Sequence, residues 1–218
     1  MPGSRVGFPN VLAYHGAVSA TFVEPCIPTR ASKLPTGPQW IHEIKHDGYR
    51  LIVCRRGDRV RLFTRRGYDW TDRYPLIVAA ADALPCNATI DGEVVVCDRA
   101  GVADFERLHS REHDRQAFLW AFDLLALDGE DLRPRSLLER KGALRQLLRR
   151  AKTGVHFVDH VEGDGAKLFA HACELGLEGI VSKDRTRSYR SGRSKTWLNI
   201  KNPAAPGVTR FEERDASA

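Results

Sequence analysis

A lysine early in the chain stands among residues that suit covalent chemistry. Lys45 lies in the segment EIKHDGYR, residues 43–50, where a strand pattern ends and a turn containing Gly48 begins. A lysine amine attacks phosphorus only when it is neutral, so its surroundings, including cations such as Arg50, must favour loss of its proton. Strand alternation places Glu43 and Lys45 on one face. Taken alone, this spacing is more typical of a surface hairpin than of a nucleophilic lysine, so the choice depends on the segments that accompany it.

Further segments follow Lys45 in an order that gives it partners. One supplies consecutive arginines, one a carboxylate on an apolar strand, one an aromatic ring on another strand, and two more a carboxylate and cations. The segments are TRRG (64–67), IDGEVVV (90–96), AFDL (121–124), LEGIVSK (177–183) and WLNIK (197–201). Such groups bind nucleotides, phosphates and metal ions. Their order favours a phosphoryl-transfer site over an isolated hairpin.

Short β-patterns separated by turns must position these segments. The predicted strands span residues 40–45, 49–54, 60–64, 89–97, 118–125, 179–183 and 197–201, and the predicted helices span 74–84, 136–151 and 165–175. Hairpin-like strand pairs with inserted helices are typical of an α+β fold with antiparallel sheets and flanking helices. Residues 1–39 carry six prolines and little periodicity, so we interpret them as an extended lead-in to regular structure that begins near Trp40.

Length and composition fit one domain with an anionic partner. The chain has 218 residues, and 34 Lys and Arg against 28 Asp and Glu leave a net charge of +6. That charge is equally consistent with a solvated basic surface. Five cysteines without a Cys-x-x-Cys pair favour a reducing, cytosolic compartment over a disulfide framework or a zinc site. The apolar stretch at 6–20 is interrupted by Pro9, Asn10 and His15, and no run approaches the roughly 20 apolar residues of a membrane span.

Together the segments resemble the successive nucleotidyltransferase motifs of ATP-dependent ligases and capping enzymes. The similarity is greatest to the ligase module of bacterial end-joining ligases, and the stretch from Glu178 through YRSGRS (189–194) to Trp197 is the most family-specific. The resemblance covers about residues 22–205. It implies the covalent nucleotidyltransferase fold of a DNA ligase adenylation domain, with ATP and Mg²⁺ (or Mn²⁺) as cofactors and nicked or broken DNA as the partner.

The resemblance also implies a mechanism. Lys45 attacks the α-phosphate of ATP, becomes a lysyl-AMP intermediate, and later passes AMP to a DNA 5′-phosphate to seal breaks during DNA repair and recombination. The implied location is the bacterial cytoplasm, in association with the nucleoid and without membrane attachment.

Further implied roles belong to nucleotide binding. Glu43 recognises the adenine edge and Phe122 stacks on the base. Arg50 and Arg65 contact the ribose, the phosphate or the DNA 5′-end, because a fork of donors binds phosphate bidentately. Lys201 contacts the α-phosphate. Glu43 otherwise is a surface carboxylate paired with a basic neighbour.

Core packing is the alternative for Phe122. By alternation this ring shares a strand face with Phe118, Trp120 and Leu124, so it also fits the interior. Position within the resembling motif favours stacking on the base.

Two carboxylates and two less certain positions complete the implied site. Glu93 and Glu178 bind the metal ion or accept hydrogen bonds from the ribose hydroxyl groups. By strand alternation Lys183 lies on the face opposite Glu178, so the pattern favours a site role for Lys183 less than for Glu178. Related ligases carry two lysines around one residue in the last motif, whereas this chain has Asn199 and Lys201. Loss of one cation costs about 1 to 3 kcal/mol of transition-state stabilisation, or roughly tenfold to a hundredfold in rate.

A basic helical segment has no place in these motifs. Residues 133–152 combine an apolar leucine stripe with Arg140, Lys141, Arg145, Arg149 and Arg150. We interpret the basic side as a solvated helix face, with contact to a DNA backbone as the alternative. The nearby EGDG segment (162–165) predicts a turn with a helix cap, because no Gly-Lys-Ser/Thr follows it.

Other functions and the domain boundaries stay open at this point. RNA ligation and GTP-dependent capping use the same lysine chemistry, and a non-catalytic module that binds DNA ends is a third hypothesis. We expect an N-terminal extension (1–21), an adenylation domain (22–205) and a polar tail (206–218). The tail is too short for the OB-fold domain of full ligases. A partner that supplies this domain, or an end-joining recruiter, is therefore expected.

Overall fold

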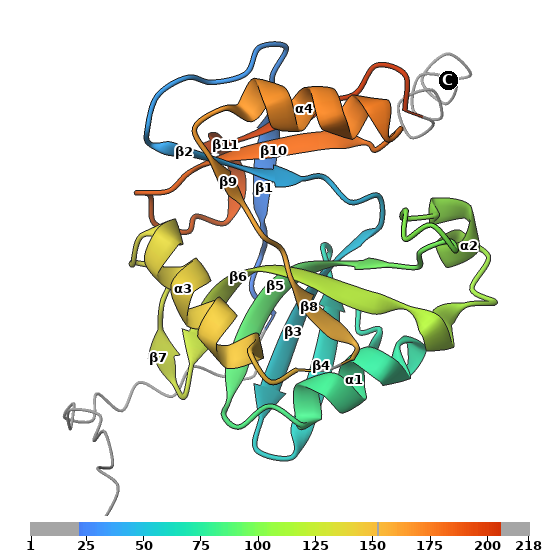
Figure 1. The fold of residues 1–218 in the computed structure, drawn as a ribbon. Coiled ribbons are helices and arrows are strands. Elements are labelled where there is room, and N and C mark those ends of the chain that lie inside the picture. The colour runs from blue at the N-terminus through green and yellow to red at the C-terminus, as the bar shows by residue number, and fades with distance from the viewer. Residues whose placement is uncertain (1–21, 152, 206–218) are drawn as a thin grey trace, which may run out of the picture.

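The computed structural model describes residues 22–151 and 153–205 (Figure 1). The predicted N-terminal extension and polar tail lie outside these described residues. Within them, no helix is both long enough and apolar enough to span a membrane. All five cysteines are free.

Two β-sheets form the body of the protein. Sheet A has five strands in the spatial order β1 (Cys26–Arg30), β11 (Gly192–Lys201), β10 (Gly179–Asp184), β2 (Trp40–Ile44) and β9 (Val161–Glu162). Sheet B has the order β4 (Arg59–Thr64), β3 (Tyr49–Arg56), β5 (Ala88–Val95), β6 (Phe118–Leu127) and β7 (Glu130–Asp131), and β8 (Val155–Phe157) pairs with β6. Sheet B lies below sheet A in Figure 1.

Helices flank both sheets. They are α1 (Pro75–Asp82), α2 (Phe105–His109), α3 (Leu137–Leu148) and α4 (Gly165–Glu174), with 3₁₀ turns η1 (Thr71–Arg73) and η2 (Asp114–Gln116). Helices α1 and α4 cover the outer faces of the two sheets, and α2 and α3 lie at their sides (Figure 1). Ile77 of α1 packs into the core of sheet B, and Ala172 of α4 packs against Ile180 on the outer face of sheet A. Figure 1 shows α4 above sheet A and α1 below sheet B.

Local sequence explains where the helices begin. Pro75 occupies the first turn of α1, where its missing N–H costs nothing. Ser136 and Glu139 form a reciprocal capping box at the start of α3. Asp164 caps α4 by accepting from the Lys167 N–H, so the predicted turn and cap at residues 162–165 are confirmed.

A separate core joins the two sheets. It contains Ile52 and Leu125 from sheet B, Ile41 and Trp197 from sheet A, and Leu137 from α3. This core fills one end of the space between the sheets, and the other end is left open as a cleft.

The α+β class and each predicted strand and helix are confirmed, with ends shifted by a few residues. The prediction of an extended lead-in before Trp40 is wrong, because β1 lies within it. β1 pairs in parallel with β11, and β8 pairs in parallel with β6, so both sheets are mixed. Pro28 fits β1 because this strand is at the edge of its sheet.

The predicted face of β6 is wrong at Leu124. Two irregularities in its pairing with β5 leave Phe122 and Leu125 without direct partners. Such bulges shift the alternation of side chains. Trp120 and Phe122 therefore face sheet A, whereas Leu124 packs into the core on the opposite face.

The predicted solvated basic face of α3 is also wrong at two positions. Arg140 and Lys141 are fully buried, while Arg145, Arg149 and Arg150 are exposed. Arg140 donates twice to Asp123 of β6, at 2.8 Å each. Each buried cation has a carboxylate partner, and such pairing is what makes its burial tolerable.

Candidate active site

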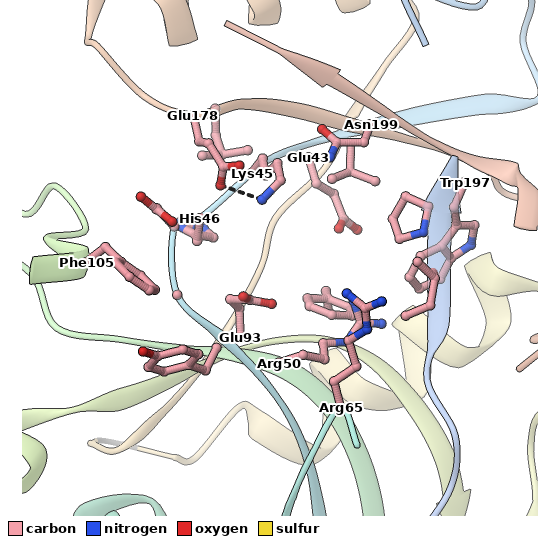
Figure 2. A pocket seen from close by; sticks show the side chains of 18 of the residues that line it. Glu43, Lys45, His46, Arg50, Arg65, Glu93, Phe105, Glu178, Trp197 and Asn199 are labelled. Carbon is pink, nitrogen blue, oxygen red and sulfur yellow. Dashed lines mark hydrogen bonds and ion pairs between the residues drawn. The ribbon is translucent and has the colours of Figure 1, made fainter. Parts of the chain in front are cut away.

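A cavity of about 1250 Å³ lies between the two sheets. Its lining includes every residue that the sequence nominated: Glu43, Lys45, Arg50, Arg65, Glu93, Phe122, Glu178, Lys183, Asn199 and Lys201. Figure 2 shows side chains from both sheets pointing toward one another across this space. The predicted residues are brought together although they span more than half of the chain.

Register across the strands explains how the walls are built. In sheet A, Glu43 pairs with Val181, Val181 with Asn199, and Asn199 with Arg30. Residues directly opposite each other on neighbouring strands share a face. This row lines one wall of the cavity. In sheet B, Arg50 pairs with Glu93, which places both on the facing wall.

Lys45 follows the last residue of β2 and reaches the carboxylate of Glu178, to which its ammonium donates a hydrogen bond. The Nζ atom of Lys201 lies 3.6 Å from the other oxygen of Glu178. Glu178 thus joins the two lysines expected to act on a phosphate. It precedes β10, so strand alternation does not apply to it, and the prediction that it faces away from Lys183 is wrong, because both residues line the cavity.

Two motif glycines allow this arrangement. A Cβ at Gly48 would lie 2.1 Å from the Val94 carbonyl oxygen. Gly179 has a φ of 135°, and a Cβ there would lie 2.1 Å from the Ile200 carbonyl oxygen. No larger residue fits either position. These glycines bring Lys45 and Glu178 close to the neighbouring strands.

Glu93 is a carboxylate with a perturbed proton affinity. Burial raises its pKa from 4.5 to about 7, although Lys45 and Arg50 act in the opposite direction. Among the described residues, its side chain has no hydrogen-bond partner. Within that part of the chain no group of three or more His, Cys, Asp or Glu side chains forms a ready metal site.

The far end of the cavity is lined by a fully paired carboxylate. Glu43 is 2% exposed, and its Oε1 accepts from Lys141 at 2.6 Å and its Oε2 from Lys183 at 2.5 Å. Burial opposes ionisation of Glu43, but Lys141 and Lys183 overcome this effect and lower its pKa. Its paired lysines are buried too, in contrast to the predicted alternative of a surface carboxylate.

Phe122 and Arg50 lie beside this carboxylate. Arg50 donates to both oxygens of Asp91, at 2.5 and 2.7 Å, and its guanidinium carbon lies 4.4 Å from the Phe122 ring centroid. Lys183 lies 4.1 Å from the same centroid. Asp91 also accepts from the Tyr189 hydroxyl at 2.6 Å. Arg50 is therefore held as part of a buried network, and Phe122 presents an aromatic ring between cations.

The sequence that carries these neighbouring features, a lysine joined to a carboxylate and an aromatic ring near a buried glutamate, matches a family model along most of its length. The model of the ATP-dependent DNA ligase domain matches residues 25–201. The chain belongs to this family.

Relatives of the ligase domain include bacterial end-joining proteins. The chain is 38% identical over 185 residues to the multifunctional non-homologous end joining protein LigD of Pseudomonas aeruginosa, covering 83% of the chain and 22% of that protein. It is 30% identical over 186 residues to the SPbeta prophage-derived DNA ligase-like protein LigB of Bacillus subtilis, covering 83% of the chain and 68% of LigB. The chain thus spans about a fifth of LigD.

Solved ligase structures have the same fold. The ligase domain of Mycobacterium tuberculosis LigD superposes with a TM-score of 0.74 at 36% identity, over 81% of this chain and 60% of that one. A mycobacterial DNA ligase D complexed with ATP and MES gives a TM-score of 0.73 at 36% identity, over 81% and 59%.

Several cavity residues of this ligase domain were not found from the sequence. The His46 ring stacks on Trp120, with centroids 4.8 Å apart, and burial lowers the His46 pKa to about 4. Phe105 lines the opening from α2. His46 could have been identified from the sequence by its position next to Lys45 in the motif. No sequence feature pointed to Phe105.

The rim of the cavity carries exposed arginines. Arg65 and Arg66 follow β4 on sheet B, and Arg30 and Arg193 lie on β1 and β11 of sheet A. None of them has an ion-pair partner among the described residues. Arg30 was not predicted from the sequence because β1, the strand that carries it, was not predicted. The rim therefore offers cations on both sides of the opening.

Proposed function

We propose that this chain is the adenylation domain of an ATP-dependent DNA ligase, which stores AMP on Lys45 and transfers it to a DNA 5′-phosphate. The observation that carries the proposal is the contact between Lys45 and Glu178 inside the cavity, with Lys201 beside them and Glu43 at the far end. A nucleotide laid along the cavity would bring its base to Glu43 and Phe122 and its phosphates to the lysines.

The first step follows from these positions. Lys45 loses a proton to Glu178, and its neutral nitrogen attacks the α-phosphorus of ATP. A nitrogen–phosphorus bond forms while the bond from phosphorus to the bridging oxygen of pyrophosphate breaks, and pyrophosphate leaves with that electron pair. Lys201, next to Glu178, stabilises the negative charge on the phosphate oxygens.

The next steps regenerate the free Lys45 side chain. A DNA 5′-phosphate oxygen attacks the phosphorus of lysyl-AMP, the nitrogen–phosphorus bond breaks, and the Lys45 nitrogen keeps the electron pair and takes up a proton. The 3′-hydroxyl oxygen of the adjoining strand then attacks the DNA 5′-phosphorus and releases its proton to water, while AMP leaves with the electron pair of the broken phosphorus–oxygen bond and the break is sealed. Arg65, Arg66, Arg30 and Arg193 offer the cations that would hold the DNA phosphates at the opening.

The two cavity carboxylates fit a magnesium ion brought with the nucleotide. Mg²⁺ binds through one or two carboxylates together with substrate phosphates and water. Glu93 has no competing hydrogen bond among the described residues, and Glu178 has oxygens facing the same space. A bound ion would neutralise charge on the phosphates during transfer. Glu93 and Glu178 are the residues that would hold it.

The wider setting is part of the same proposal. A nicked or broken DNA substrate implies work in the bacterial cytoplasm, at the nucleoid. We also predict a partner protein that recruits the chain to DNA ends or carries an OB-fold domain.

The test is incubation with α-labelled ATP and Mg²⁺, followed by denaturing electrophoresis. We expect a covalent label that survives denaturation and disappears when the labelled protein is given a nicked duplex. A parallel reaction with GTP distinguishes adenylation from capping chemistry. Binding to nicked DNA without any covalent label would contradict the proposal and favour the non-catalytic end-binding module.

A further inference from the structure

A lysine outside the cavity lining touches the carboxylate that faces the base. Lys141 lies on α3, is 1% exposed, and donates to Glu43 at 2.6 Å. The two residues are 98 positions apart in sequence. Lys183 contacts Glu43 from within the cavity, whereas Lys141 reaches it from behind.

Lys141 is itself held in place by more than one acceptor. Its Nζ atom also donates to the Val158 carbonyl oxygen at 2.9 Å. Glu43 is on β2 of sheet A, so Lys141 connects that sheet to α3, whose Leu144 packs into the core of sheet B. The direction of the Glu43 carboxylate is thereby fixed before a ligand enters.

This arrangement determines what Glu43 offers to a nucleobase. With an ammonium group on each oxygen, the carboxylate stays ionised and can only accept hydrogen bonds. Each oxygen keeps a further lone pair for a ligand. A base with an exocyclic amine on the facing edge donates a hydrogen bond to that lone pair. A base with a carbonyl oxygen there would place its own acceptor against the Glu43 carboxylate, and no hydrogen bond would form.

We propose that Lys141 is a positioning residue for nucleobase selectivity, which keeps Glu43 an acceptor aimed at the base and so favours 6-amino purines over 6-oxo purines. The inference rests on the proposed function and names a residue that acts through Glu43 without touching the nucleotide. Removal of Lys141 takes the donor away from Oε1 of Glu43 while Lys183 still holds Oε2, so Oε1 can shift or take up a proton and then donate to an oxo group.

The experiment compares ATP with inosine triphosphate, which differs by the replacement of the 6-amino group with an oxo group. Rates of covalent adduct formation are measured in separate reactions by intact-protein mass spectrometry, and nucleotide affinities are measured by calorimetry. In Lys141→Met we expect the preference for ATP to fall by about tenfold, the effect of one selective hydrogen bond. Lys141→Arg should retain the preference to within about threefold, because a guanidinium still donates to Glu43.

Arg140→Met is the matched control, because it removes the neighbouring buried cation without touching Glu43. We expect this variant to lose stability, seen by thermal unfolding, and to keep the wild-type preference for ATP. An unchanged preference in folded Lys141→Met would overturn the inference, as would an equal loss in Arg140→Met. If Lys141→Met does not fold, Lys141→Gln takes its place with the same expected result.

Failure of the proposed function gives a different signature. Wild-type protein would then form no adduct with either nucleotide. The calorimetric comparison of ATP with inosine triphosphate would still test Lys141, since selective binding does not require the covalent step.

Discussion

At the end of the cavity proposed to hold the base, here called the base end, Glu43 is 2% exposed and both of its oxygens are bonded to lysines. At the end proposed to hold the phosphates, here called the phosphate end, Lys45 keeps 22% of its side chain exposed and shares the carboxylate of Glu178 with Lys201. The rim of the cavity carries arginines with no ion-pair partner among the described residues. Charges at the base end are thus buried and paired, whereas the lysines at the phosphate end are paired but partly exposed. Substitutions at the first end should mainly lower stability, and substitutions at the second should mainly change activity.

The largest effect is expected at the nucleophile. Lys45→Ala should abolish the covalent adduct with ATP, because no other group supplies that amine. The free energy of unfolding should change by less than about 1 kcal/mol, since a partly exposed ion pair contributes little. Labelling and thermal unfolding check the two parts. Persistent labelling in the variant would show that another residue is the nucleophile.

The next effect concerns the network beneath the base end. Asp91 is fully buried and holds both Arg50 and Tyr189. Asp91→Asn leaves the buried Arg50 guanidinium without its charge partner and should lower the free energy of unfolding by about 3 to 5 kcal/mol. Urea unfolding measures the loss. A change below about 1 kcal/mol would mean that water reaches Arg50 and that the base end is less closed than its contacts indicate.

A gain of activity is expected from Asn199→Lys at the phosphate end. Asn199 Oδ1 is buried and has no hydrogen-bond partner within residues 22–151 and 153–205, so its removal breaks no bond there. A second cation near Lys201 should speed adduct formation by about tenfold to a hundredfold, which corresponds to about 1 to 3 kcal/mol. Single-turnover labelling measures this rate. An unchanged or lower rate would point to compensation by Arg30, which pairs with Asn199 across the strands, and Arg30→Ala would then slow the wild-type reaction.

The smallest effect is a pH dependence of stability at Glu93. The folded protein keeps the Glu93 proton up to about pH 7, whereas the unfolded chain loses it near 4.5. Since the folded state binds more protons in this window, the Glu93 contribution to stability falls as pH rises through it. Glu93→Gln should remove a decline of about 2 kcal/mol between pH 5 and pH 7.5. The diagnostic quantity is the difference between wild type and variant in urea unfolding at pH 5 and pH 7.5. Parallel curves would show that Glu93 is ionised throughout.

Sequence patterns were sufficient where the signal is local. Strand alternation and turn residues located β2 to β6, and motif glycines marked the turns beside Lys45 and Glu178. β1 was missed because Pro28 within it and Pro25 just before it argue against a strand, and only its position at a sheet edge makes Pro28 tolerable. The bulges in β6 were missed because they depend on pairing with β5.

The charge state of the site was beyond sequence reasoning for a related reason. A lysine or arginine on a helix normally predicts exposure, and Arg140 and Lys141 are buried only because Asp123 and Glu43 meet them there. Glu43 is 98 positions from Lys141, so no local pattern connects the two. The motif identified Glu43 as a candidate, but the three-dimensional contacts were needed to show that Lys141 holds its carboxylate in place.

The parallel pairing of β1 with β11 has a consequence for synthesis on the ribosome. Thr29 Oγ1 donates to the Ser194 carbonyl oxygen across 165 positions of sequence. Closing so long a loop is slow and cannot begin until the later strand has emerged. Sheet B, in contrast, draws its main strands from one continuous stretch of chain, and we expect it to form first. Lys45 would therefore meet Glu178 and Lys201 only as synthesis passes residue 201, so the proposed reaction cannot begin before β10 and β11 are made.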